Sequence, residues 1–108
     1  MGVDVVLMRV ARQGTSPKHR RLPPLASAGD EDDVIARTFS GSGKPMLSRV
    51  DPYGEVVLSP AEMGQFIAEA ESLAAGADVT GAGRIRRVVE LARRCRDTPG
   101  TELHLQGD

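Results

Sequence analysis

The chain has 108 residues, and its 14 lysine and arginine residues nearly balance its 15 aspartate and glutamate residues, giving a formal net charge of −1. This balance excludes a strongly basic nucleic-acid binder on composition alone. Because domains commonly hold roughly 100 to 200 residues, we predict one domain over residues 1–108 with one modest core.

The cysteine content and the N-terminus predict the cellular compartment. Cys95 is the one cysteine, so the chain cannot form an internal disulfide. Asp4 and Arg9 interrupt the first apolar segment, where a signal peptide would be uninterrupted. No apolar run approaches the roughly 20 residues that a bilayer-spanning helix needs. We predict a cytoplasmic protein that does not enter a membrane.

The first predicted element is a strand over residues 2–10. Val3, Val5 and Leu7 alternate with residues that are themselves largely apolar, which is typical of a strand between two neighbours. Residues 11–33 follow as a long loop, mobile in part, because prolines and glycines interrupt every regular pattern.

The segment 34–39 is too short for its periodicity to distinguish a strand from a helical turn. Between these two readings we favour a helix. Its N-terminal cap would be Asp32 or Asp33, since aspartate is a preferred cap residue.

A β-hairpin is predicted next, between residues 46–50 and residues 55–58. Its turn would be Asp51-Pro52-Tyr53-Gly54. Aspartate at the first position can accept bonds from backbone amides, proline presets φ at the second, and glycine at the fourth relieves crowding.

Two amphipathic helices follow the hairpin. The first begins at Ser59-Pro60-Ala61-Glu62, where a hydroxyl cap, an early proline and a glutamate suit a helix N-terminus, and Gly76 can end it. The second runs from about Gly81 to Arg96. Each helix has apolar residues at intervals of three and four, and we expect these stripes to be buried: Met63, Phe66, Ile67, Ala70, Leu73 and Ala74 in the first, and Ile85, Val88, Val89, Ala92 and Cys95 in the second.

The last predicted element is a strand over Thr101 to Gln106, in which polar and apolar residues alternate. Two helices with one apolar stripe each are best accommodated by an α+β two-layer sandwich, with a mainly antiparallel sheet of three or four strands and both helices, antiparallel to each other, on one face. We place the first strand centrally, beside the last one. Its two apolar faces leave open a homodimer packed on the second sheet face.

The Asp51 to Gly54 turn is followed by Glu55, and later by Met63, Cys95 and the final Gly107-Asp108. In these features the second half of the chain resembles a group of short uncharacterised bacterial, largely actinobacterial, proteins. Such small domains sometimes resemble immunity proteins of toxin systems. The resemblance implies one architecture and supplies no catalytic residue. Glu55 stands where aspartate is usual, and the final strand has no aromatic residue.

The sequence shows no catalytic, cofactor-binding or metal-binding set. A phosphate loop is excluded around Gly43-Lys44, because Thr38 and Pro45 occupy the places of a glycine and a hydroxyl residue. Two distant histidines and one cysteine have no zinc-site spacing. Cys95 lies on an apolar stripe, which favours a buried and inert thiol.

The most unusual surface feature is the outer face of the second helix. We predict an interaction surface that comprises Tyr53, Arg86, Arg87, Arg93 and Arg94. A solvated face without a partner is the simplest alternative for such charges. Nucleic acid is disfavoured by the net charge and by the presence of only three aromatic residues, although a basic helix can contact phosphates.

Three functional hypotheses follow. The first is a non-enzymatic protein-interaction module, immunity-like or regulatory, with an unknown protein partner and no cofactor. The second is a small ligand-binding domain or enzyme in which Asp51, Tyr53 and His104 converge in a cleft. The third is nucleic-acid binding through the arginine-rich second helix.

Overall fold

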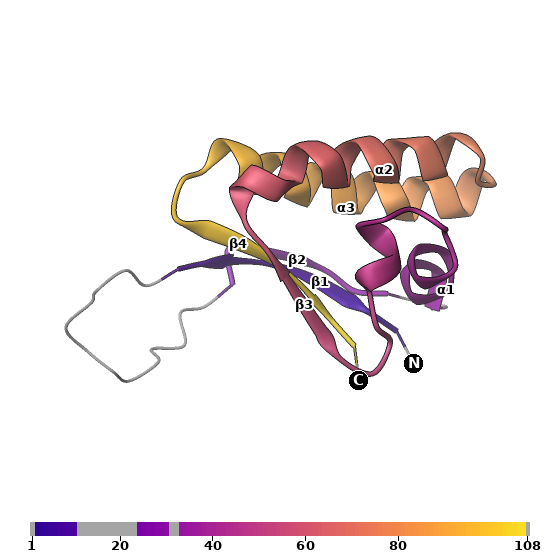
Figure 1. Ribbon diagram of the computed structural model, residues 1–108, viewed down its shortest axis with the longest axis horizontal. Coiled ribbons are helices and arrows are strands. Elements are labelled where there is room, and N and C mark those ends of the chain that lie inside the picture. Colours follow the sequence, from indigo (N-terminus) through magenta and orange to yellow (C-terminus); the bar gives the residue numbers. More distant parts are fainter. Residues whose placement is uncertain (1, 11–23, 31–32, 108) are drawn as a thin grey trace.

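A computed structural model describes residues 2–10, 24–30 and 33–107. A four-stranded antiparallel sheet carries α2 and α3 on one face, which confirms the predicted α+β sandwich (Figure 1). The elements in chain order are β1 (Asp4–Arg9), β2 (Ala26–Ala28), α1 (Val34–Ser40), the 3-10 turn η2 (Leu47–Arg49), β3 (Glu55–Leu58), the 3-10 turn η3 (Pro60–Glu62), α2 (Met63–Ala75), α3 (Val79–Asp97) and β4 (Thr101–Gln106).

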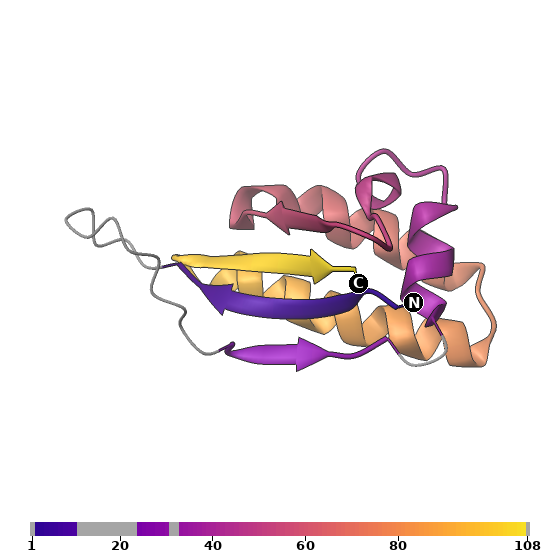
Figure 2. The ribbon, with the colours of Figure 1, turned by 90° about the horizontal axis from the view of Figure 1, so that it is seen from below.

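The strand order is β2-β1-β4-β3, so the first strand lies centrally and beside the last, as predicted. Figure 2 shows these strands side by side with the helices behind them. The register places Val6 opposite Ser27 on one side and opposite His104 on the other, and His104 lies opposite Val57. These four residues form one row across the sheet, on the face that α2 and α3 leave uncovered.

The core lies between the sheet and the two long helices. Val5 and Leu7 of β1 and Leu103 and Leu105 of β4 are fully buried, because alternate residues of a strand point to the same face. The predicted helical stripes meet them and are confirmed, with only Leu73 partly buried at the margin of the core; the buried members are Met63, Phe66, Ile67, Ala70, Ala74, Ile85, Val88, Val89, Ala92 and Cys95.

The helix boundaries follow their caps. The predicted capping box is present, since the Ser59 amide donates to Glu62 Oε1 over 2.9 Å. A 3-10 turn forms first, and α2 continues from Met63. The second long helix begins two residues before the predicted Gly81, because the Asp78 carboxylate accepts a hydrogen bond from the Gly81 amide over 2.7 Å and caps the helix there.

The predicted hairpin is wrong. Residues 47–49 form the turn η2, and β3 pairs with β4 instead of with the segment before it. The reason is tertiary: Glu69 Oε1 of α2 accepts hydrogen bonds from the amides of Met46 and Leu47 over 2.9 and 3.0 Å. Both side chains are buried, so the segment packs as a short helical turn under α2. The turn at Asp51 is confirmed, with the Gly54 amide donating to the Asp51 carbonyl.

The predicted loop 11–33 contains a strand that the sequence analysis missed, β2. Its three residues, Ala-Ser-Ala, have no β-branched or aromatic member, so its pairing with β1 creates the strand. Residues 11–23 and the acidic residues 31–32 of the loop lie outside the described residues, and so does the prediction that the loop is mobile in part.

The predicted helix after this loop is confirmed as α1, but its cap is different. Asp33 occupies the N-cap position with φ of 57° and makes no capping bond with its side chain. Asp30 takes that role: Oδ1 accepts from the Ile35 amide, and Oδ2 accepts from the Ala36 and Val3 amides, all within 2.9 Å. Asp32, the other predicted cap, lies outside the described residues. Among the helices that are described, none has the length and hydropathy needed to cross a bilayer.

Candidate functional site

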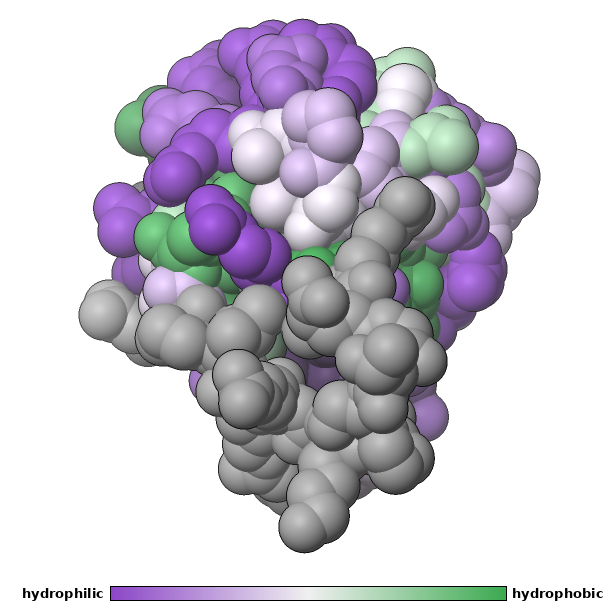
Figure 3. All heavy atoms as spheres, turned by 90° about the vertical axis from the view of Figure 1, so that its left-hand side faces the viewer, coloured by the Kyte–Doolittle hydropathy of each residue, from purple (hydrophilic) through white to green (hydrophobic). Residues whose placement is uncertain are grey.

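The arginines of α3 form an exposed, positively charged surface. Arg86, Arg87, Arg93 and Arg94 are all exposed, as predicted from the helical periodicity. Arg93 pairs with Glu71 of α2, whereas the other three have no carboxylate partner among the described residues. In Figure 3, hydrophilic residues gather over the helical layer at the top of the molecule. The helices thus present fixed positive charge to solvent.

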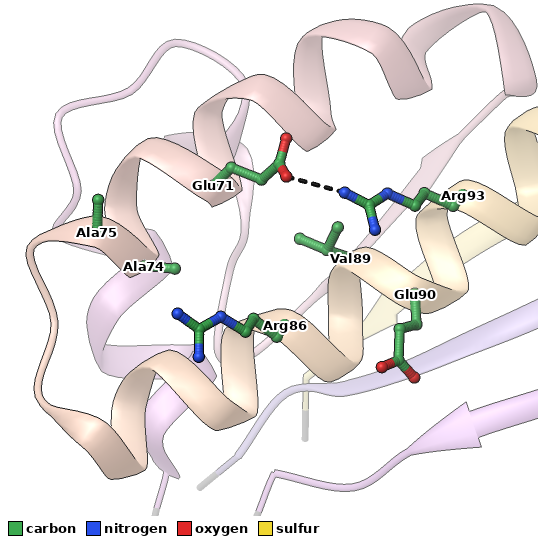
Figure 4. A pocket seen from close by; sticks show the side chains of 7 residues that line it. All are labelled: Glu71, Ala74, Ala75, Arg86, Val89, Glu90 and Arg93. Carbon is green, nitrogen blue, oxygen red and sulfur yellow. Dashed lines mark hydrogen bonds and ion pairs between the residues drawn. The ribbon is translucent and has the colours of Figure 1, made fainter.

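A groove of about 380 Å³ runs between α2 and α3 beside these arginines (Figure 4). Arg86 and Arg93 extend from α3 toward α2, with Val89 between them. The exposed fractions of Val89 and Ala74 are 3% and 7%, so these two residues form an apolar floor to the groove. The residues that line the groove are Glu71, Ala74, Ala75, Arg86, Val89, Glu90 and Arg93.

The four arginines do not share one surface. Arg87 lines a second hollow, of about 270 Å³, together with Ala28 and Gly29 beside the edge strand β2. Arg94 follows Arg87 by two helical turns and therefore points to the same side of α3. The predicted arginine face consequently divides into a pair at the α2–α3 groove and a pair toward β2.

Tyr53 lies away from both arginine pairs. Its side chain is 73% exposed, as expected for the tip of a turn, and its amide donates to Asp51 Oδ1 over 2.9 Å. Figure 1 shows the turn before β3 close to the C-terminus, at the end of the strand remote from α2 and α3. Tyr53 and the arginines of the predicted interaction surface are therefore separate features.

The hypothetical cleft of Asp51, Tyr53 and His104 is not assembled by hydrogen bonds in the described chain. His104 lies opposite Val57 within β3, whereas Tyr53 precedes this strand in the turn. Its ring instead contacts two carboxylates that the sequence analysis did not select: Nδ1 is 3.2 Å from Glu55 Oε2, and Nε2 is 3.1 Å from Glu102 Oε1.

This cluster of Glu55, Glu102 and His104 lies on the uncovered face of the sheet. Glu102 could have been found from its i, i+2 spacing to His104, but Glu55 reaches them only through the pairing of β3 with β4. The hydrogen bond from His104, followed by that from Gln106, lowers the pKa of the Glu55 carboxyl below its ordinary value. The arrangement orders these side chains. No group of three metal-ligating side chains in the described residues could hold a metal ion.

Cys95 is fully buried on the core side of α3, as predicted. Burial is the main reason that the pKa of its thiol is raised. Since the thiolate is the reactive form, this raised pKa lowers the nucleophilicity of the group at neutral pH. The thiol is a packing group.

The residues that line the α2–α3 groove include several that the sequence analysis did not select, above all Glu71 and Ala75. Helical periodicity could place each on an outer face, yet no local signal indicates which residues of two helices meet across a groove. Comparisons of this chain with family models, with curated proteins and with solved structures give no match.

Proposed function

We propose that this chain is a non-enzymatic protein-interaction module, regulatory or immunity-like in kind, that docks an acidic partner protein on the helical layer formed by α2 and α3. One observation carries the proposal: Arg86 lines a groove with an apolar floor and has no carboxylate partner within the described residues. A cation held beside apolar surface gains most from a partner that brings both negative charge and apolar contact.

Nucleic acid fits this surface less well. Two carboxylates, Glu71 and Glu90, line the same groove and would repel a closely spaced row of phosphates. Phe39 and Phe66 pack edge to face in the core with ring centroids 6.1 Å apart, so neither can stack on a base. Tyr53 is the one remaining aromatic residue, and it lies at the remote turn.

The test is capture of partners from a native lysate on three immobilised proteins: the unaltered chain, Arg86→Glu and Arg9→Glu. Arg9 is exposed at the end of β1, so its reversal changes the net charge equally without altering the groove. We expect a protein that binds the unaltered chain and Arg9→Glu but not Arg86→Glu, and that cross-links to α2 or α3. Recovery of no such protein would refute the proposal. A recovered species that nuclease removes would assign the surface to nucleic acid instead.

A further inference from the structure

The two arginines of the α2–α3 groove have different surroundings. Arg93 Nη2 lies 2.9 Å from Glu71 Oε2. Arg86 stands two helical turns earlier on the same side of α3, and there α2 presents Ala74 and Ala75, the next turn after Glu71 (Figure 4). The groove therefore has one arginine that is paired with a carboxylate and one that lies beside alanines.

The chemistry of Arg86 and its surroundings specifies which ligand group can bind there. A guanidinium stays protonated at every physiological pH and offers a planar fork of donors that matches a carboxylate. Val89 and Ala74 form apolar floor beside it and can accept a small aliphatic side chain. The carboxylates of Glu71 and Glu90 limit the negative charge that the groove tolerates. A single carboxylate next to an aliphatic group satisfies all three conditions.

We infer that Arg86 binds a carboxylate of the partner while an aliphatic side chain of the same segment rests on Val89 and Ala74. The partner segment thus presents an acidic side chain and an aliphatic side chain next to each other, as neighbouring turns of an amphipathic helix can do. The inference rests on the proposed function, since it names the segment that docks. The Arg93–Glu71 ion pair forms one boundary of the site and confines the incoming carboxylate to Arg86.

The decisive variant leaves every arginine in place. Ala75 is exposed and lines the same groove, so Ala75→Glu supplies an internal carboxylate that competes with the partner for Arg86. Ala75→Gln is the matched control, because it has nearly the same size and no charge. The probe is a synthetic helical peptide of glutamate, leucine and alanine, with a second peptide in which glutamine replaces every glutamate.

Titration followed by the NMR signals of the Arg86 Nε–H group and the Val89 methyls gives the readout. We expect the glutamate peptide to shift both signals, and Ala75→Glu and Arg86→Gln each to weaken its binding about tenfold, the equivalent of one desolvated charge contact. Two controls separate the effect of charge from that of size. Ala75→Gln should bind the glutamate peptide as the unaltered chain does, and the glutamine peptide should bind the unaltered chain weakly. Thermal unfolding of Ala75→Glu at or above that of the unaltered chain shows that its fold is intact.

Two results would overturn the inference. One is binding of the peptide to Ala75→Glu as tightly as to Ala75→Gln. The other is a peptide that leaves the Val89 methyls unshifted. If the lysate experiment recovers a partner that requires Arg86 but binds Ala75→Glu normally, the inference that Arg86 binds a partner carboxylate is wrong and the proposed function stands. If no partner requires Arg86, the proposed function fails, whatever the peptide does.

Discussion

Arg93 Nη2 lies 2.9 Å from Glu71 Oε2, and this ion pair joins α3 to α2 across the groove between them. Both side chains are about half exposed, at 50% and 53%, so solvent screens their attraction. The main effect of the pair is on the charge pattern: it neutralises one arginine of the groove, whereas Arg86 has no carboxylate partner in the part of the chain that the structure describes.

Glu71→Gln should therefore change binding more than stability. An exposed ion pair contributes at most about 1 kcal/mol, so we expect the free energy of unfolding to fall by less than that. Because Arg93 becomes available, affinity for the glutamate peptide should rise about two- to fivefold, as measured by calorimetric titration. Asp97→Asn is the control, since it removes the same charge from α3 at its Arg96 contact, outside the groove. Weaker binding by Glu71→Gln would contradict the role given to the pair.

Asp30→Ala should be among the most destabilising single changes of an acidic residue. The carboxylate accepts from the amides of Val3, Ile35 and Ala36, and thereby joins the start of β1 to the start of α1. Hydrogen bonds to a charged group contribute more than neutral ones, and we expect a loss of about 2–3 kcal/mol in the free energy of unfolding by urea.

Asp78→Ala is the reference variant with which the stability loss of Asp30→Ala is compared. Its carboxylate caps α3 through one bond, to the Gly81 amide, so the expected loss is about 1 kcal/mol. Equal losses in Asp30→Ala and Asp78→Ala would show that Asp30 acts as an ordinary helix cap and that its bond to Val3 adds nothing.

The hydrogen bond between His104 and Glu55 predicts an acid-sensitive contribution to stability. That bond is the largest cause of the lowered pKa of Glu55. Because folding lowers this pKa, Glu55 stabilises the fold above its ordinary pKa of 4.5 and loses the contribution as the pH falls through the folded-state value. His104→Ala should therefore lose less stability than the unaltered chain on going from about pH 5 to about pH 3. Urea unfolding at both pH values measures this difference, and parallel losses would argue against it.

Gly107→Ala should destabilise the end of the sheet. The Gly107 amide donates to the Gly54 carbonyl over 2.7 Å, and a Cβ at position 107 would overlap the carbonyl of Pro52. Overpacking against backbone costs about 1–3 kcal/mol, since the turn cannot move away without breaking this bond. Thermal unfolding gives the cost. Gly64→Ala is the contrasting variant, because a Cβ there meets nothing within 4 Å and alanine suits the interior of α2 better than glycine, so this change should stabilise the fold. A Gly107→Ala protein as stable as the unaltered chain would show that the turn moves away without cost.

The same contact gives a physical basis to the motif behind the resemblance. The Asp51 to Gly54 turn and the terminal Gly107-Asp108 are far apart in sequence, yet Gly54 and Gly107 are hydrogen-bonded neighbours at the end of β3 and β4. A glycine at position 107 is required by the close approach of the turn. The membership in a family of such proteins stays a prediction.

Local physical chemistry was enough to predict several elements of this protein. The Ser59 to Glu62 capping box favours a helix start from local sequence alone, because its bonds lie within four residues. The stripes of α2 and α3 require a common apolar surface, and the alternating residues of β1 and β4 supply it. These signals depend on near neighbours in the chain, so the two-layer fold and the exposure of the arginines followed from sequence.

Contacts between distant residues decided the rest. Glu69 turned a predicted strand into η2, Asp30 replaced a nearer aspartate as the cap of α1, and β1 made a strand of Ala26–Ala28. The two arginines of the groove differ likewise, because Arg93 pairs with Glu71 whereas Arg86 lines the groove beside Ala74 and Ala75, and this difference depends on how the two helices align. Sequence specified which faces carry charge, and only tertiary packing determined which charges were neutralised, because pairing requires proximity in space.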